Sequence, residues 1–524
     1  MLFIVEYFRV FKMKKIPVAI VALLTSGSMA AQNIYQMEQV SSNDLTGTAR
    51  YVGMGGAMSA LGADISVMGT NPAGIALFRR SDIAASLSVV SQQKGEKFDG
   101  KSPTHVSFDN IGFVFASQYN TDAVVRFFNF GFNYNKRKNM NQLLSAGMED
   151  PAGGMSQLWQ LADMNYDWGG VDKSTPLARG AYRLGLIRED GVDEQGYKKY
   201  VSDYYSNANI YKSATWGGIQ QYDFNFSTNL LDRFYLGMTI GFYNVDYKSY
   251  AIYDESLDDG DKMVEPSYLT NETVISGNGF DVKFGGIVRP FEDSPFRIGF
   301  SVATPIFYSL KTRSYATLSW DGYDYGMDNS YKYNIRSPWR FGLSLGHTIG
   351  NFLALGAEYE YADYGSTKVS YDSYYDDGWE AWTEETNDRA LNNEAKRYLK
   401  GVSSFKIGAE ARVADGFYLR AGYNYVQSPI EKDAYYNQYI NSASLDYSTS
   451  TAYMNLSDIN RFTCGIGMRG KHLYADFAYQ YQKQSGQFYA FTSQWPYDNL
   501  PNELPATKIN LDKHQVVFTL GYKF

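Results

Sequence analysis

Phe128-Asn129-Phe130-Gly131-Phe132-Asn133-Tyr134-Asn135 carries an aromatic side chain at every second position, with asparagine or glycine between. Successive side chains of a β-strand point to opposite faces, so this stretch has one apolar and one polar face. The same alternation recurs in fourteen stretches that run from about Ile83 to Phe524. The pattern predicts an antiparallel sheet that meets an apolar medium on one face.

The links between these stretches alternate between short and long. Six contain only a few residues, such as Glu292-Asp293-Ser294-Pro295 and Ala414-Asp415-Gly416, and the seven others are predicted to span from about 15 to about 75 residues. Transmembrane barrels have this arrangement because tight turns face the periplasm and long loops face outside. We therefore predict an all-β fold, a fourteen-stranded antiparallel transmembrane β-barrel formed by residues 82–524.

Composition agrees with a barrel and excludes several other classes. Aromatic residues make up 16% of the chain, yet after the N-terminus no run approaches the roughly 18 apolar residues of a spanning helix. The net charge of −8 gives no support for nucleic-acid binding. The single cysteine, Cys464, cannot form an internal disulfide and is predicted to face lipid, and the four histidines lack metal-ligand spacing. We expect no metal and no cofactor.

The first residues have the order of a secretory signal. Lys14-Lys15 precede an apolar run over residues 16–24, and small residues lead into Gln32. We expect residues 1–31 to be removed on export, and Met13 also begins a well-proportioned signal by itself. The expected location is the outer membrane of a Gram-negative bacterium, among its lipids, with the C-terminal Phe524 recognised by the barrel assembly machinery.

Charged residues occupy the polar face of three consecutive predicted strands. They are Glu358, Glu360, Lys406, Glu410, Arg412 and Arg420. A basic side chain on the lipid face would cost about 2–4 kcal/mol near the midplane, so the set is predicted to face the lumen. Mutual pairing that stiffens the wall is one role for these charges, and contact with a polar ligand head group is the alternative.

A barrel of fourteen strands encloses a lumen wider than side chains alone fill. Residues 32–81 precede the first predicted strand and are rich in glycine, alanine and serine, which is typical of a compact plug. The glycines allow close backbone approach to the wall, and Pro72 restricts Asn71 to extended or turn geometry.

This segment resembles the N-terminal hatch of the FadL/TodX family of outer-membrane channels. The matching residues are Gly53, Gly55 and Gly56, followed by Asn71-Pro72-Ala73-Gly74. The resemblance implies uptake of long-chain fatty acids or other hydrophobic compounds, with a ligand bound beside the hatch. It further implies that a hatch movement opens an exit through the barrel wall. The alternative for these seven residues is a well-packed, static plug.

The longest predicted loop, residues 138–212, holds two helix-like segments. Their apolar faces contain Leu158, Trp159 and Leu161 in the first, and Tyr182, Leu184 and Leu186 in the second. These residues are predicted to form an outer groove that captures hydrophobic ligands, or else the two helices simply pack on each other. Residues 379–400 are predicted to form another helical insert, an outer lid without a site.

The predicted function is passive uptake of hydrophobic or amphipathic molecules by lumen binding and lateral release. One alternative is a scaffold of the same fold that binds a protein partner for secretion or surface attachment, and another is haem binding. A barrel phospholipase would need Ser344 in Gly342-Leu343-Ser344-Leu345-Gly346 as nucleophile. That motif requires a strand, a sharp turn and a helix, whereas this stretch continues a strand into a short turn. We therefore expect no catalytic residue and no enzyme.

Overall fold

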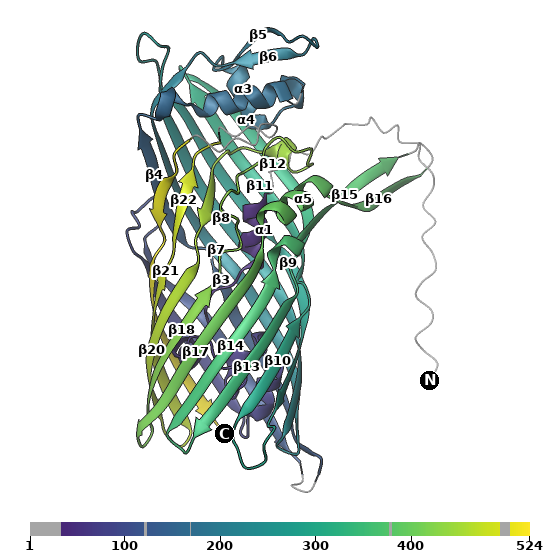
Figure 1. Ribbon diagram of the computed structural model, residues 1–524, viewed down its shortest axis with the longest axis vertical. Helices are drawn as coiled ribbons and strands as arrows, with labels where there is room; N and C mark the ends of the chain where they lie inside the picture. Colours follow the sequence, from purple (N-terminus) through teal and green to yellow (C-terminus); the bar gives the residue numbers. More distant parts are fainter. Residues whose placement is uncertain (1–32, 120–122, 168, 377–379, 493–503) are drawn as a thin grey trace, which may run out of the picture.

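The computed structural model describes residues 33–119, 123–167, 169–376, 380–492 and 504–524. Antiparallel strands form a barrel (Figure 1), which closes because the last strand pairs with the first from Asp82↔Lys523 to Gln92↔Lys513. The predicted signal peptide, residues 1–31, lies outside the described residues. The prediction of a fourteen-stranded antiparallel barrel is confirmed.

Eleven of the fourteen positions in the barrel wall are single strands. They are β1 (Asp82–Gln92), β2 (Thr104–Gln118), β3 (Val125–Asn139), β7 (Tyr205–Leu230), β8 (Phe234–Asp258), β9 (Ser267–Val288), β17 (Gly401–Ala414), β18 (Phe417–Val426), β20 (Ile459–Arg469), β21 (Leu473–Lys483) and β24 (Lys513–Lys523).

Three positions consist of two strands in succession. The pairs are β10 (Arg297–Ala303) with β11 (Phe307–Trp320), β12 (Tyr323–Arg336) with β13 (Arg340–Ile349), and β14 (Leu353–Asp363) with β15 (Lys368–Asp376). Pro305 and Pro338 interrupt the first two pairs, since proline has no N–H to donate to a ladder. The 3-10 turn η5 (Tyr364–Ser366) interrupts the third.

The remaining elements belong to the N-terminal segment and the outer loops. The N-terminal segment, residues 33–81, contains α1 (Ile34–Ser41), α2 (Ala49–Gly53), η1 (Ile65–Gly69) and η2 (Pro72–Leu77). The loops contain β4 (Gln142–Glu149), η3 (Ala152–Gly154), α3 (Gln157–Asp167), η4 (Val171–Lys173), α4 (Pro176–Arg183), β5 (Arg188–Val192), β6 (Lys198–Val201), β16 (Ala381–Asn387), α5 (Arg389–Tyr398), η6 (Leu445–Tyr447), β19 (Tyr453–Leu456), β22 (Ser485–Tyr489) and β23 (Thr507–Asn510).

The two faces of the wall differ as the alternation predicts. Phe128, Phe405 and Ile407 are exposed on the outer face, whereas Asn129 and Lys406 are buried on the inner face. An outer band of this kind faces lipid in a transmembrane barrel. Cys464 is also exposed. Among the described residues, no helix is long and apolar enough to cross a membrane.

The alternation inverts in the outer half of the barrel. Tyr243 and Val245 on β8 are buried inside, while Asn244 on the same strand is exposed. The pairing of β8 with β9 runs through these residues without a register shift, so β8 has no bulge at Tyr243-Asn244. The strand instead continues outward, and its inner-face residues Tyr243 and Val245 belong to one buried apolar cluster with residues of α1.

This extension also shortens the outer loops. The six short links are confirmed, but the long links after β8 and β11 are reduced to residues 259–266 and Asp321-Gly322 because the strands continue outward.

Residues 379–400 differ from the prediction of one helix. The first part forms β16, which pairs with β15, and only α5 is helical; Trp379 lies outside the described residues.

Candidate functional site

The N-terminal segment lies inside the barrel (Figure 1), against a row of glycines on the inner wall. Gly346, Gly356, Gly408 and Gly422 are direct neighbours on β13, β14, β17 and β18. A Cβ at Gly356 would collide with the carbonyl of Ala57, and one at Gly408 with that of Met54. The row therefore allows main chain to lie directly on the wall.

Gly53 and Gly55 of the predicted hatch motif meet the same side of the barrel, whereas Gly56 packs within the segment against Leu45 and Tyr51. The carbonyl of Gly53 accepts a hydrogen bond from Thr463 at 3.1 Å, and that of Gly55 accepts one from Asn424 at 3.3 Å. Gly55 has a φ of 62°, and a Cβ there would lie 2.9 Å from the amide nitrogen of Tyr423. Gly56 also has a positive φ, 80°.

Asn71-Pro72-Ala73-Gly74 contacts the opposite wall, formed by β7, β8 and β9. Asn71 is fully buried and caps η2, since its side-chain oxygen accepts from the amide of Ala73 at 3.1 Å. Asn225 of β7 donates to the carbonyl of Pro72 at 3.2 Å. A Cβ at Gly237 or Gly285 would collide with this tetrapeptide. Both predicted hatch motifs are therefore packed against the wall.

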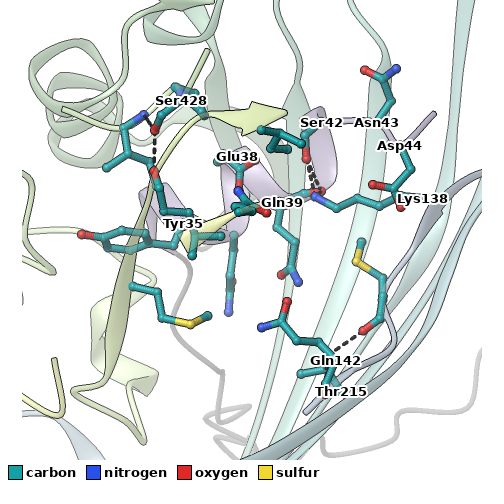
Figure 2. A pocket seen from close by; sticks show the side chains of 18 of the residues that line it. Tyr35, Glu38, Gln39, Ser42, Asn43, Asp44, Lys138, Gln142, Thr215 and Ser428 are labelled. Atoms are coloured by element: carbon teal, nitrogen blue, oxygen red, sulfur yellow. Dashed lines mark hydrogen bonds between the residues drawn. The ribbon is translucent and has the colours of Figure 1, made fainter. Parts of the chain in front are cut away.

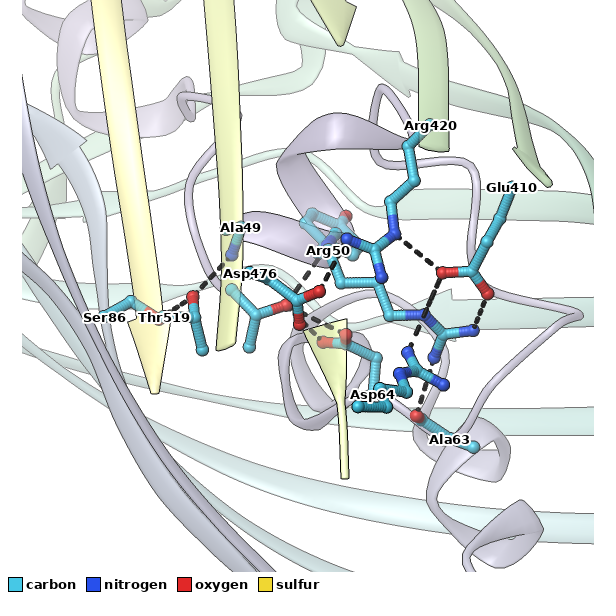
Figure 3. Close-up of polar contacts among 12 residues, drawn as sticks. Ala49, Arg50, Ala63, Asp64, Ser86, Glu410, Arg420, Asp476 and Thr519 are labelled. Atoms are coloured by element: carbon cyan, nitrogen blue, oxygen red, sulfur yellow. Dashed lines mark hydrogen bonds and ion pairs between the residues drawn. The ribbon is translucent and has the colours of Figure 1, made fainter. Parts of the chain in front are cut away.

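A buried ion cluster joins the segment to the wall (Figure 3). Arg50 binds Glu410 through two hydrogen bonds of 2.9 and 2.8 Å, and donates to the carbonyl of Ala63 at 3.0 Å. Arg420 binds Glu410 at 2.7 Å and Asp476 at 2.6 Å. Two-pronged arginine–carboxylate pairs are among the strongest polar contacts in proteins.

The structure separates the six predicted lumen charges into three groups. Glu410 and Arg420 belong to the ion cluster, while Lys406 pairs with Glu358 at 2.6 Å and lies 3.6 Å from Glu360. Arg412 does not join either group. It lies at the short-turn end of β17, half-exposed, and pairs with Asp415 of the turn. Sequence reasoning missed Arg50 and Asp476 in this network.

A cavity of about 350 Å³ lies beside the N-terminal segment in the outer half of the lumen (Figure 2). Residues of α1 and the following turn line it, including Tyr35, Glu38 and Asp44. Apolar groups such as Met140 and Ile430 line it as well. The volume falls in the roughly 300–1,000 Å³ range of small-molecule sites. The mixed lining suits a molecule that has both polar and apolar parts.

Three cations at this cavity have no carboxylate within hydrogen-bond distance. Arg461 is 2% exposed and donates to Gln482 at 2.8 Å and Asn424 at 2.9 Å. Its Nη2 makes no hydrogen bond in the described part of the chain and lies 3.8 Å from Asp44.

The other two cations bind only main-chain carbonyls or a hydroxyl. Lys138 donates to the carbonyl of Gln39 at 2.8 Å and to Ser42 (Figure 2). Lys513 donates to the carbonyl of Asn141 at 3.1 Å. A buried cation without a counter-ion favours the binding of an anionic group.

The predicted capture residues of the longest loop are only partly accessible. The two predicted helices are present as α3 and α4, but Leu158, Leu161 and Leu186 are at most 1% exposed. They pack into one apolar core with barrel residues instead of lining an open groove, which corrects the prediction for these three. Trp159, Tyr182 and Leu184 are half-buried at the edge of that core.

The motif around Ser344 lies within strand β13, as predicted, and is not a strand–turn–helix. Ser344 is 3% exposed and faces the lumen near Asn71. Within the described residues, no group of three or more His, Cys, Asp or Glu side chains could hold a metal ion.

Comparison with known proteins identifies similar folds at low sequence identity. No family model matches the chain, and no curated protein matches it. The toluene transporter TodX of Pseudomonas putida aligns with a TM-score of 0.49 and 13% identity over 92% of this chain and 99% of that one. A FadL homologue of Pseudomonas aeruginosa aligns with a TM-score of 0.48 and 14% identity over 92% and 99%. The chain is similar in structure to these two proteins.

Proposed function

We propose that this barrel carries amphipathic molecules, such as long-chain fatty acids, passively across the outer membrane of a Gram-negative bacterium. The observation that carries the proposal is the cavity of about 350 Å³ with Arg461 on its wall, whose Nη2 has no hydrogen-bond partner among the described residues. The guanidinium would bind an anionic or polar head group, and the apolar lining would hold the hydrocarbon body. The concentration gradient, with trapping inside the cell, supplies the driving force.

In this proposal the N-terminal segment acts as the hatch. Gly53 and Gly55 rest on one wall, and Asn71-Pro72-Ala73-Gly74 rests on the other. The segment fills the lumen beneath the cavity, so passage requires part of it to move. The contacts of Asp44 with Arg461 and Asn139 lie where the cavity floor meets the segment, and a bound head group would compete for them.

We propose lateral release between β2 and β3. The hydrogen-bonded ladder of these strands ends at Asn110↔Asn135, although both strands continue outward. Beyond that point His105 and Asn139 face each other through side chains at 2.9 Å. A side-chain contact opens at lower cost than a backbone ladder, which supports an exit at this seam.

The experiment compares uptake of oleate and of oleyl alcohol into liposomes that contain the purified protein. Arg461→Gln should slow oleate uptake about tenfold, because a hydrogen bond to a charged group contributes about 1.5–3 kcal/mol. Uptake of the alcohol should not change. Lys248→Gln, an exposed lysine that pairs with Asp246, is the matched control. Equal uptake of oleate by wild type, Arg461→Gln and protein-free liposomes would contradict the proposed function.

The scaffold alternative has one specific observation in its favour. The hairpin of β15 and β16 projects from the barrel (Figure 1) and exposes Tyr374 and Trp382, with Trp382 stacked on Tyr375 at 5.8 Å. Exposed aromatic clusters are typical of protein interfaces. A stoichiometric partner from native membranes that is lost in the Trp382→Ala variant, with oleate uptake absent in wild type, would favour the scaffold.

A further inference from the structure

A second, smaller cavity of about 60 Å³ lies between the N-terminal segment and the wall formed by β3, β7, β9, β10 and β13. The segment contributes Thr46, Ser66 and Thr70 to its lining. It shares Asn43, Asp44, Tyr51 and Glu360 with the larger cavity, so these residues separate the two spaces.

Arg137 lies on the inner face of β3 and lines this cavity. It follows Asn133 and Asn135 at every second position, so the strand alternation places it inward, where it is 6% exposed. The pairing of β3 with β7 then goes from Lys136↔Gln220 to Lys138↔Ile219, which leaves Arg137 as the extra residue of a β-bulge. A lysine, Lys136, precedes it on the same strand but does not line this cavity.

The Arg137 guanidinium is poorly satisfied by the protein. Its Nη1 lies 3.5 Å from the side-chain oxygen of Gln221, and its side chain stacks on the ring of Tyr243. Its Nε and Nη2 have no hydrogen-bond partner among the residues that the structure describes. Leaving charged donors buried and unpaired costs free energy that a bound anion would recover.

The nearby carboxylates are already engaged by other cations. The charged residues that line the cavity are Asp44, Arg137, Asp281, Lys283, Arg340 and Glu360. Lys283 binds Asp281 at 2.7 Å and Asp223 at 3.2 Å, and Lys406 lies 3.6 Å from Glu360.

Arg340 adds a second guanidinium without a carboxylate partner in the described structure. It donates to Asn43 at 3.0 Å and to the carbonyl of Ser41, both in the N-terminal segment. The cavity is too small for a hydrocarbon chain, but a carboxylate-sized group fits it.

We propose that Arg137 and Arg340 form a second anion-binding subsite, which takes one carboxylate-sized group. The site rests on the proposed function in one respect: the anionic end of a ligand released from Arg461 would reach it once Asn43 and Asp44 move. The anion can also arrive free, and both sources share the same chemistry.

The test is calorimetric titration of the purified full chain in a neutral detergent with sodium acetate at low salt. Wild type should bind two acetates, one at Arg461 and one at Arg137. Arg137→Gln should retain one, Arg461→Gln should retain one, and the double variant should bind none. Lys136→Gln is the matched control, since Lys136 is on the same strand and lines neither cavity. Arg340→Gln should weaken the second acetate at least tenfold.

Two acetates bound by Arg137→Gln with unchanged affinity would overturn the proposal, as would a single acetate in wild type that only Arg461→Gln removes. Heat-dependent gel mobility shows whether each variant still forms the barrel, and Arg137→Lys provides a variant that keeps the charge. Titration with hexanoate separates the two sources of the anion. If the end group of a longer ligand can occupy the subsite, hexanoate displaces acetate from both sites; if only a free anion can, hexanoate displaces acetate from the Arg461 site alone. Acetate binding without oleate uptake in wild type would refute the proposed transport and leave the subsite in place.

Discussion

Arg50→Ala should release the N-terminal segment from the wall without opening the barrel. The substitution removes a two-pronged pair with Glu410, in which the two side chains are only 15% and 7% exposed, and a bond to the carbonyl of Ala63. Breaking a buried pair costs about 3–5 kcal/mol. Glu410 keeps Arg420 at 2.7 Å, so the lower end, about 3 kcal/mol, applies.

This loss corresponds to roughly a hundredfold increase in the population with a detached segment, at about 1.4 kcal/mol for each factor of ten. Hydrogen exchange followed by mass spectrometry measures the population with a detached segment directly. The amide of Val52 bonds to the carbonyl of Thr48 within α2 and should exchange about a hundredfold faster. Amides of the ladder between β1 and β24 should not change.

The control is Arg79→Ala at the other end of the same segment. Arg79 pairs with Asp232, and both side chains are 44% exposed, so the pair contributes at most about 1 kcal/mol. Exchange in α2 should then change by a factor of five or less. If Arg50→Ala accelerates exchange in α2 no more than Arg79→Ala does, the ion cluster does not hold the segment and the reasoning is wrong.

Three further predictions concern the wall, the outer loop and the lipid face. Gly356→Ala should destabilise the folded barrel, since the added Cβ collides with the carbonyl of Ala57. Gly326→Ala should be neutral, because a Cβ added there has no atom within 4 Å. Urea unfolding compares the stability of the two variants. Burial raises the pKa of Asp163 on α3 to about 7, so the native state binds more protons than the unfolded chain and the loop loses stability as pH rises from about 4 to 7. The opening free energy of α3, obtained from amide exchange corrected for the intrinsic rate at each pH, should fall over that range, and Asp163→Asn should abolish this slope. Cys464, labelled with a fluorophore in liposomes, should be quenched by lipid-bound quenchers and not by iodide, and the reverse would place β20 outside the lipid band.

Strand positions and faces could be predicted from the sequence wherever one face meets lipid. Phe405 and Ile407 point outward and Lys406 inward, because period-two alternation reports a lipid–lumen difference directly. The same rule fails above the lipid band. There Val245 is buried in a cluster with α1 while Asn244 is exposed, so the apolar side changes and the alternation predicts loops where the strands continue.

The contacts that assemble the site have no local signal in the sequence. Arg50 and Glu410 are 360 positions apart, and nothing near Arg50 indicates a partner. The glycine row could have been predicted from the sequence, since Gly356, Gly408 and Gly422 each occupy an inward position that alternates with outward side chains on neighbouring strands. The alternation places Arg137 on the inner face of β3, but the lack of a partner for its Nε and Nη2 among the described residues depends on how distant segments pack around it.

Thr519 on the last strand has a consequence for how the chain is made. It accepts a hydrogen bond from the amide of Ala49 at 2.7 Å and lies 2.7 Å from the hydroxyl of Ser86 on the first strand (Figure 3). One hydroxyl thus joins the earliest and latest parts of the polypeptide, 470 positions apart. Contacts of such separation form late in folding. The N-terminal segment, although synthesised first, can be seated only as the barrel closes, so a nascent chain that lacks β24 would have neither a sealed wall nor a filled lumen.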